Sequence, residues 1–310
     1  MIMRESLEVL DTIRLNFNPE GLMLLNISLA FIMFGVALGL RVENFKRVVK
    51  NPKSAVVGVM AQFVIMPAFT FLLILLIRPS ASVAMGMILV AACPGGNVSN
   101  FITSLAKGNV ELSVSLTGIA DLSAIVMTPF NFALWASLYN LTSDKVIPIQ
   151  IDLFEMFKTM LLLLAFPVTV GMLFAYYFPK ITQKIFNPIK IASILIFIGY
   201  IVAALGLNFD HFLNYIYLVV WIVLIHNSLA FGTGYLMARI FKLPDKDVRT
   251  LTIETGIQNS GLGLVLIFNP NLFDGLGGMA FIAAWWGVWH IIAGLTLGFF
   301  WKGKQVKSLA

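Results

Sequence analysis

The chain has 310 residues, of which 59% are hydrophobic and 12% are charged, and its mean hydropathy is +0.91. A soluble domain carries about 25% charged residues, so this composition excludes an ordinary soluble enzyme and indicates a membrane protein. The net charge of +6 does not indicate nucleic-acid binding, because the basic residues are spread along the chain rather than clustered on one soluble face. The single cysteine, Cys93, excludes an intramolecular disulfide and any multi-cysteine metal site.

The first residues of the chain mix charged and apolar side chains and contain no continuous apolar stretch. A secretory signal would need an apolar run of about 7–15 residues. We therefore expect residues 1–20 to form a polar lead-in, either a short amphipathic helix or an irregular segment. Residues 21–310 are expected to form a single transmembrane unit.

The remainder of the chain is divided into long apolar stretches. A spanning helix needs about 20 mostly apolar residues, and about nine stretches reach that length. Prolines 52, 79, 148, 179, 188, 244 and 270 fall between them, where proline ends helices. We predict an all-α membrane protein with about nine transmembrane helices, at residues 22–40, 54–77, 83–106, 112–139, 154–178, 189–207, 212–241, 248–268 and 276–301.

The basic residues favour one orientation of these spans. With the N-terminus outside, 16 of the 21 basic residues fall on the inner side, and cytoplasmic loops are enriched in Lys and Arg. The outer side keeps Arg4, Arg14, Arg78, Lys145 and Lys158. We predict a multi-pass protein of the plasma membrane, or of the bacterial inner membrane in a prokaryote, with a cytoplasmic C-terminus. The inner residues are Arg41, Lys46, Arg47, Lys50, Lys53, Lys107, Lys180, Lys184, Lys190, Arg239, Lys242, Lys246, Arg249, Lys302, Lys304 and Lys307.

Two predicted spans are interrupted by polar and glycine residues near their middle. In the third, the run from Cys93 to Asn97 contains one proline and two glycines, which remove a helix donor and add backbone freedom. In the eighth, Glu254, Gln258 and Asn259 stand among glycines. Each break lies about ten residues into its span, which is near mid-depth at about 1.5 Å per residue. We expect two pairs of half-helices.

Such breaks favour a transport function. Lipid cannot satisfy free backbone groups, so non-helical backbone at this depth must be surrounded by protein or by a watery cavity. Broken helices in corresponding positions of two halves are typical of the binding site of a secondary transporter. The alternative is a pair of kinked helices with packing glycines. Glu254 favours the functional interpretation, because a carboxylate inside the membrane usually serves a function.

Several segments carry a resemblance to one family. They are AQFVIMPA at 61–68, ACPGGNVSNF at 92–101, GNVELSVSLT at 108–117, IETGIQNSGL at 253–262 and GVWH at 287–290. In these segments the chain resembles the bile acid:sodium symporter family, and the resemblance extends over nearly all of the chain from residue 22.

The resemblance implies a fold and an activity. The fold would be an inverted repeat with a core domain, which includes the broken helices at 83–106 and 248–268, and a panel domain made from the first, fifth and sixth spans. The activity would be symport of an organic anion with two sodium ions by alternating access. The anion would be bile-acid-like, or a small carboxylate or sulfonate such as pantoate. We expect no obligate protein partner.

The resemblance also implies two sodium sites that share Glu254. The first would use Ser99, Asn100, Ser113, Thr117 and Glu254, and the second Gln62, Glu254, Gln258 and the backbone carbonyls of Thr255 and Ile257. Ser113 and Thr117 lie four residues apart on one helix face, and hard cations prefer oxygen ligands. The alternative for these hydroxyls is a bond to their own helix carbonyls.

For the organic anion we expect Asn97 and Asn259, with the backbone amide near Val98 and, as a lesser candidate, His290, which could equally be a packing residue. Asp121 lies four residues after Thr117 and therefore on the same helix face. The family pattern does not lead us to expect an acid there. It could be a protonatable group, a contact for a cationic part of the substrate, or a buried acid bonded to a neighbour.

Other functions remain open at this point. One is a proton-coupled organic-anion carrier that uses Asp121 and Glu254. Another is an arsenite-type exporter, in which Cys93 would act instead of serving as a packing residue. An intramembrane enzyme is disfavoured, because the three histidines are scattered and form no H-E-x-x-H pattern.

Overall fold

The computed structural model describes residues 2–15, 19–40, 52–143 and 152–305. Within these ranges the regular elements are helices, and extended pairing is limited to two isolated bridges, Arg14 with Leu276 and Gly95 with Gln258. The predicted all-α architecture is therefore confirmed for the part of the chain that the structure describes.

Most of the helices are long and apolar. Six helical runs in the described residues have the length and composition to cross a membrane, and α11 is a further long helix of 29 residues. Two of the runs are continuous helices that widen into a π-turn, α4–η1–α5 and α9–η2–α10. The long elements are α2 (Pro19–Ala37), α4 (Pro52–Met60), η1 (Ala61–Ile65), α5 (Met66–Ile77), α8 (Val110–Thr142), α9 (Leu153–Met160), η2 (Leu161–Ala165), α10 (Phe166–Tyr177), α11 (Pro179–Leu207), α12 (Phe209–Ile240) and α15 (Gly277–Lys302).

The third and eighth predicted spans are each two helices, as expected. The third consists of α6 (Ala81–Ala92) and α7 (Val98–Leu105), and the eighth of α13 (Asp245–Gly256) and α14 (Ser260–Phe268). Each pair is followed by a long helix, α8 or α15. Helix α8 packs against both halves of its own pair, and α15 packs against both halves of each pair. The breaks therefore lie inside the packed group of helices.

The predicted start of the sixth span at residue 189 is wrong. Helix α11 begins ten residues earlier at Pro179, and Pro188 lies inside it. Pro179 suits the first position of α11, because the missing N–H of a proline there has no helical partner to lose. Phe178 alone separates α11 from α10. Lys180, Lys184 and Lys190 are consequently on a helix and not in a loop. Pro148 lies outside the described residues.

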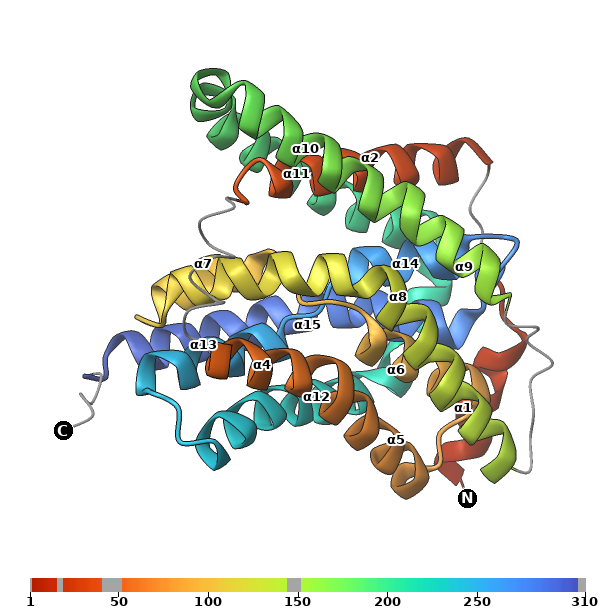
Figure 1. Cartoon of the computed structure of the whole chain (residues 1–310). Coiled ribbons are helices and arrows are strands. Elements are labelled where there is room, and N and C mark those ends of the chain that lie inside the picture. Colours follow the sequence, from red (N-terminus) through yellow and green to blue (C-terminus); the bar gives the residue numbers. More distant parts are fainter. Residues whose placement is uncertain (1, 16–18, 41–51, 144–151, 306–310) are drawn as a thin grey trace.

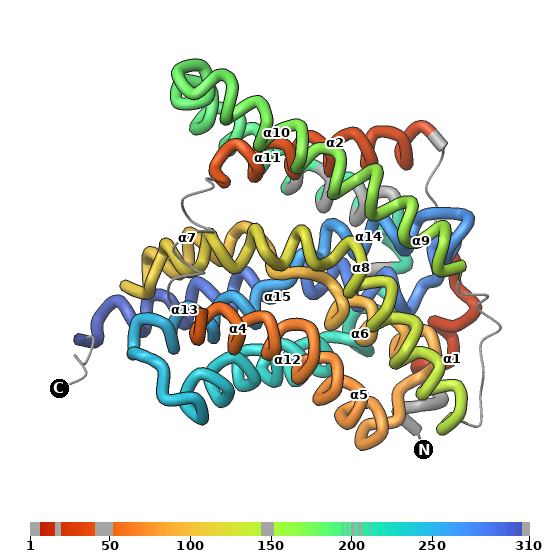
Figure 2. Tube along the Cα trace, viewed as in Figure 1, coloured from red at the N-terminus to blue at the C-terminus, as the bar shows by residue number. Residues whose placement is uncertain are grey.

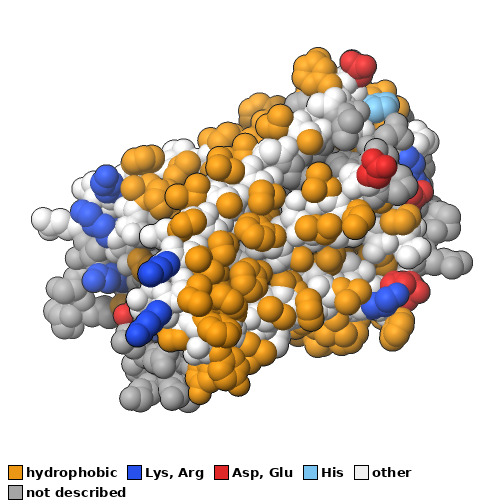
Figure 3. Space-filling view, turned by 90° about the horizontal axis from the view of Figure 1, so that it is seen from above, with side chains coloured by type: hydrophobic (Ala, Val, Ile, Leu, Met, Phe, Trp, Pro, Cys, Tyr) orange, Lys and Arg blue, Asp and Glu red, His pale blue; other side chains and the backbone are white. Residues whose placement is uncertain are grey.

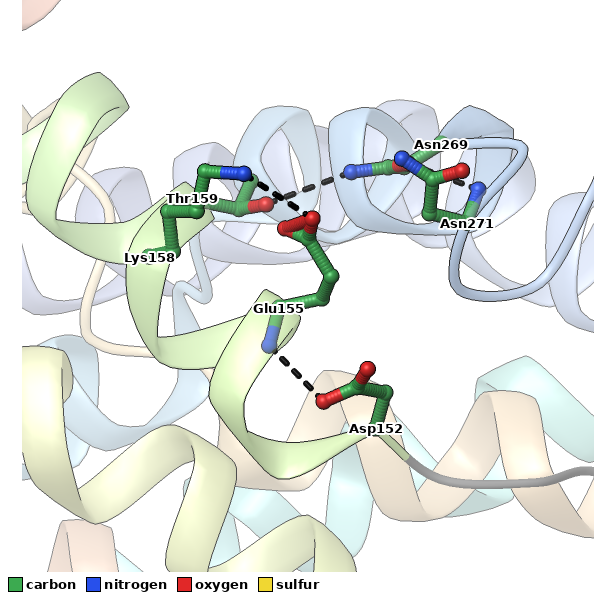
Figure 4. Close-up of polar contacts among 6 residues, drawn as sticks. All are labelled: Asp152, Glu155, Lys158, Thr159, Asn269 and Asn271. Atoms are coloured by element: carbon green, nitrogen blue, oxygen red, sulfur yellow. Dashed lines mark hydrogen bonds and ion pairs between the residues drawn. The ribbon is translucent and has the colours of Figure 1, made fainter.

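The helices form two groups (Figures 1 and 2). Helices α2, α10 and α11 pack against one another in one layer, and α4 to α8 and α12 to α15 form the other. Figure 4 shows a polar link between α9 and the segment after α14, where Asn269 Nδ2 donates to Thr159 Oγ1 over 3.2 Å. Asp152 caps α9 in the same region by accepting from the amide of Glu155 at 3.0 Å.

The lead-in forms an amphipathic helix, α1 (Ile2–Thr12), so the irregular alternative is wrong. Leu7 and Leu10 are fully buried in the main hydrophobic core, where α1 packs against α6 and α15. Asp11 Oδ1 accepts a hydrogen bond of 2.9 Å from the amide of Ser82 in the first turn of α6. The lead-in is therefore joined to the start of a half-helix.

Charge is distributed unevenly between the two ends of the molecule. In Figure 3 most of the visible Lys and Arg side chains gather at the end where α7 and α15 finish, and the visible acidic side chains lie mainly toward the opposite end. Broad apolar surface separates the two ends, which suits a lipid environment. The orientation stays a prediction, and six of its basic residues lie outside the described ranges: Arg41, Lys46, Arg47, Lys50, Lys145 and Lys307.

Candidate functional site

The two breaks lie directly against each other. The amide of Gly96 donates to the carbonyl oxygen of Ile257 at 2.7 Å, and the amide of Asn259 donates to the carbonyl oxygen of Pro94 at 2.8 Å. The approach favours glycine, because a Cβ on Gly95 would lie 3.0 Å from Glu254 Oε1 and a Cβ on Gly96 would lie 3.0 Å from the carbonyl oxygen of Gln258, which is closer than most Cβ contacts. The two discontinuous helices thus meet at their breaks.

Side chains from neighbouring helices satisfy the ends of the half-helices. Thr128 Oγ1 donates to the carbonyl oxygen of Ala92 at 2.7 Å, and Asn227 Nδ2 donates to that of Gly256 at 2.8 Å. These carbonyls end α6 and α13, where no further turn supplies a donor. The sequence analysis does not single out Thr128 or Asn227. The signal that could have found them is that each is a polar residue within an otherwise apolar span.

The N-terminal ends of the second half-helices differ from each other. Asn259 caps α14, since its side chain accepts from the amide of Leu262 at 3.1 Å. Asn97 stands at the equivalent position of α7 but makes no capping bond, and its buried Oδ1 has no hydrogen-bond partner within the described ranges. Val98 begins α7, so its amide lies in the first turn as expected.

Glu254 is the centre of a buried cluster of hydroxyl groups. Its Oε1 accepts from Thr117 at 2.6 Å, and its Oε2 accepts from Ser99 at 2.7 Å and from Ser113 at 2.8 Å. The Thr117 hydroxyl also lies 3.4 Å from Asn100 Oδ1. All five residues predicted for the first sodium site are therefore brought together from α7, α8 and α13, although Thr117 also contacts its own helix at the carbonyl of Ser113.

The residues predicted for a second sodium site form an adjacent polar chain. Gln62 Nε2 donates to Gln258 Oε1 at 2.8 Å and to the carbonyl oxygen of Cys93 at 3.0 Å, while Gln258 Nε2 donates to the carbonyl oxygen of Thr255 at 2.9 Å. Gln62 Oε1 is buried without a partner. The carbonyl of Ile257 already accepts from the other break. A small cavity beside this chain is lined by Gly58, Val59, Gln62, Leu116, Ala120, Leu251, Glu254 and Thr255.

Gln62 owes its position to the π-turn η1. A π-turn inserts one extra residue into a helix and is frequent at functional sites. Pro67 follows this turn and has no N–H to complete an α-helical bond to the preceding turn, so a widened turn is well tolerated there. The widening occurs where α4–η1–α5 passes the two breaks.

The donor set suits a hard monovalent cation. It consists of a carboxylate, hydroxyls, amide oxygens and backbone carbonyls, which are oxygen ligands. Among the described residues no group of three or more His, Cys, Asp or Glu side chains is placed to hold a metal ion, so a zinc-type centre is not supported there. Two buried oxygens that can only accept, Gln62 Oε1 and Asn97 Oδ1, have no hydrogen-bond partner among the described residues.

The remaining predicted residues lie at varied distances from this centre. Asn259 Nδ2 is 3.9 Å from Met33 Sδ of α2, so Asn259 faces the junction between the two layers. His290 is buried in α15, and its Nδ1 has no hydrogen-bond partner among the described residues. Asp121 is fully buried, and neither of its carboxylate oxygens has a hydrogen-bond partner in the part of the chain that the structure describes. Cys93 is fully buried against apolar residues, with Sγ next to Gly263.

Comparison with known proteins identifies the family. Residues 26–215 match the family described as the Sodium Bile acid symporter family. The chain belongs to this family. It is 33% identical over 289 residues to the uncharacterized sodium-dependent transporter YocS of Bacillus subtilis, with 92% of this chain and 85% of that protein covered.

Eukaryotic sodium cotransporters are also similar to the chain. The chain is 33% identical over 250 residues to the probable chloroplastic sodium/metabolite cotransporter BASS2 of Oryza sativa, covering 78% of this chain but 56% of that longer protein. It is 29% identical over 246 residues to the human ileal sodium/bile acid cotransporter, covering 77% of this chain and 67% of that protein. This chain, as a member of the family, is thus a sodium-coupled multi-pass membrane transporter and not an enzyme, as the sequence predicted.

Proposed function

We propose that the protein is a symporter of an organic anion that couples uptake to two sodium ions by alternating access. It would span the plasma membrane nine times, with the N-terminus outside and the C-terminus in the cytoplasm. The observation that carries the proposal is the environment of Glu254, whose carboxylate is buried and receives three hydroxyl hydrogen bonds.

A buried carboxylate that has no basic partner among the described residues favours cation binding. An isolated charge in a low-dielectric interior is costly and is normally paired or bound to a metal. Ser99, Asn100, Ser113 and Thr117 would hold one ion with Glu254. Gln62, Gln258 and the carbonyls of Thr255 and Ile257 would hold the second ion against the same carboxylate. The hydroxyls would then turn their oxygens to the ion while still fixing the three helices relative to one another.

The anion site would lie beside the crossing, on the side of α2. The start of α7 at Val98 presents backbone amides and the positive end of a helix dipole, which attract anions. Asn97 and Asn259 would add side-chain donors, and Asn259 already contacts α2. Two relatives carry names with bile acid and metabolite as their solutes, so the proposed solutes are bile-acid-like anions and small carboxylates or sulfonates. His290 is kept as a lesser candidate.

The two layers of helices would supply a route for alternating access. The layer of α2, α10 and α11, with α9, would be the panel, and the layer that contains both broken helices would be the core. Each broken helix is preceded and followed by a long helix, which supports an inverted repeat. Movement of the core past α2 would expose the same crossing to either side. Glu254 would be neutralised throughout this movement by the bound ions, which lowers the cost of carrying it through the membrane.

Sodium-dependent stabilisation of the purified protein tests this proposal. An ion that binds only the folded state raises its stability, so the unfolding temperature in detergent should rise with sodium chloride and not with potassium or choline chloride. Glu254→Gln should abolish the rise. Equal stabilisation by all three salts, or by protons alone, contradicts sodium coupling and favours the proton-coupled carrier.

A further inference from the structure

Asp247 joins the starts of three core helices. It lies in the first turn of α13, and its Oδ2 accepts a hydrogen bond of 2.6 Å from Ser54 Oγ in the first turn of α4. Its Oδ1 accepts one of 2.8 Å from Nδ2 of Asn109, the residue just before α8. Hydrogen bonds to a carboxylate are about twice as strong as those between neutral groups, so this side chain links α4, α8 and α13 firmly.

Asn109 extends the same cluster to α7. Its Oδ1 caps α8 by accepting from the amide of Leu112 at 3.1 Å, and its backbone amide donates to Thr250 Oγ1 in α13 at 2.8 Å. The preceding residue, Gly108, donates from its amide to the carbonyl oxygen of Thr103 in α7 at 2.9 Å. A Cβ on Gly108 would lie 2.9 Å from Thr250 Oγ1. The turn between α7 and α8 is therefore held closely against α13.

The four helices that meet at this cluster also carry the side chains around Glu254. Helix α13 packs against α4, α7 and α8, and α8 packs against α4 and α7. The cluster of Ser54, Asn109, Asp247 and Thr250 therefore sets how these helices stand relative to one another. The side chains that they bring to the proposed sodium sites are Gln62 on α4–η1, Ser99 and Asn100 on α7, Ser113 and Thr117 on α8, and Glu254 on α13.

The cluster lies close to the proposed ligands along each helix. Asp247 precedes Glu254 by seven residues, and Asn109 precedes Ser113 by four. Both separations are about two helical turns or fewer. Ser113 donates to Glu254 Oε2 at 2.8 Å, so a shift between the starts of α8 and α13 would change that contact directly.

We propose that Asp247 is a positioning residue for sodium: it fixes the starts of α4, α8 and α13 so that their oxygens stand at the separations that the ion requires. The proposal rests on the proposed function, since it takes sodium to bind at Glu254. A binding site must hold its groups to within about 0.5 Å, and loss of a residue that orients metal ligands weakens metal affinity by about 10–100-fold. Asp247 acts through the helices and does not contact the ion.

Exchange of two side chains in the cluster tests this role. Asp247→Ala removes both bonds to the carboxylate and should weaken sodium affinity by about tenfold. Asn109→Asp sets two carboxylates against each other and should also weaken it. Adding Asp247→Asn to Asn109→Asp should restore the wild-type affinity, because the new amide can donate to the new carboxylate and still accept from Ser54. The new carboxylate can still cap α8, since aspartate caps helices as well as asparagine does.

The measurement separates sodium affinity from stability. Equilibrium binding of radioactive sodium to the purified full-length chain in lipid nanodiscs gives the affinity, and thermal unfolding in choline chloride gives the stability without sodium. Asp245→Ala is the matched control. Asp245 lies in the same turn of α13, but it accepts from Arg239 of α12 at 2.7 Å, so its loss should leave sodium affinity unchanged.

The outcomes separate this role from the proposed function. Weaker sodium binding in Asp247→Ala and Asn109→Asp, with recovery in the double variant and an unchanged control, supports the positioning role. Wild-type sodium affinity in Asp247→Ala overturns it, even if the variant is less stable, and so does a double variant that binds no better than Asn109→Asp. If Asp247→Ala does not fold, the comparison of Asn109→Asp with the double variant decides. A wild-type chain that binds no sodium overturns the proposed function itself.

Discussion

The amide of Gly96 donates to the carbonyl oxygen of Ile257 over 2.7 Å, so the two broken helices are joined backbone to backbone at their breaks. Ile257 follows the last residue of α13, where lipid could not supply a donor. The breaks therefore satisfy each other's free backbone groups. A change that separates them should disturb both halves of the crossing.

Gly96→Ala should weaken sodium binding by about tenfold, or about 1.4 kcal/mol. The added Cβ would lie 3.0 Å from the backbone oxygen of Gln258, which can yield only if one break moves. Sodium-dependent stabilisation of the purified variant measures the effect. Gly232→Ala is the control, because its Cβ meets open space. An unchanged sodium affinity in Gly96→Ala would show that the close approach is not needed.

Thr117→Val should weaken sodium binding by about tenfold or more. The isosteric change removes a hydroxyl 2.6 Å from Glu254, and a hydrogen bond to a charged group contributes about 1.5–3 kcal/mol. Thr252→Val is the matched control, since Thr252 is also buried but donates to its own helix at Val248. Sodium titrations measure the sodium affinity of both variants. Equal sodium affinities in Thr117→Val and Thr252→Val would show that Thr117 is not part of the proposed site.

Much of the site could be predicted from local sequence. The paired breaks are visible because proline, glycine and polar residues interrupt apolar stretches, and interruption is a local property. The convergence of Ser99, Ser113 and Thr117 on Glu254 required the family resemblance, because helix spacing places Ser113 and Thr117 on one face but does not say which helix they meet.

Other features depend on contacts between distant segments. The charge pattern predicts Arg249 in an inner loop, whereas the residue is 6% exposed and lies in the first half of α13. Asn227 stands out as a polar residue in an apolar span, but the sequence does not identify its partner, which is a backbone carbonyl 29 residues away. The start of α11 was misplaced because Pro188 suggested an end, whereas proline within a long helix is tolerated when neighbouring groups adjust.

Arg249 connects the C-terminal ends of α7 and α15 to α13. Its Nη1 donates to the carbonyls of Ala106 and Trp301 at 2.7 and 3.0 Å, and its Nη2 donates to those of Lys304 and Gln305 at 3.3 and 3.2 Å. These carbonyls lie at or just after the C-terminal ends of α7 and α15, where the helix dipole favours a cation. The guanidinium therefore holds the ends of both helices.

Arg249→Met should lower the free energy of unfolding by about 1–3 kcal/mol, because it removes the donor from the buried carbonyl of Ala106 and from three partly buried carbonyls. Arg239→Met is the control, since Arg239 is half exposed and pairs with Asp245 at the surface, where an ion pair contributes below about 1 kcal/mol. Thermal unfolding in detergent compares them. A smaller loss for Arg249→Met than for Arg239→Met would contradict the role assigned to the buried group.

Asp11 should hold the amphipathic helix α1 against the transmembrane core. Its carboxylate caps the first turn of α6, where the free amides and the dipole favour a negative group. Asp11→Ala should lower stability by about 1 kcal/mol and should raise hydrogen–deuterium exchange across residues 2–12. Asp152→Ala removes the cap of α9 instead and should leave exchange in α1 unchanged. If α1 stays equally protected in Asp11→Ala, the buried side chains of Leu7 and Leu10 alone hold the helix in place.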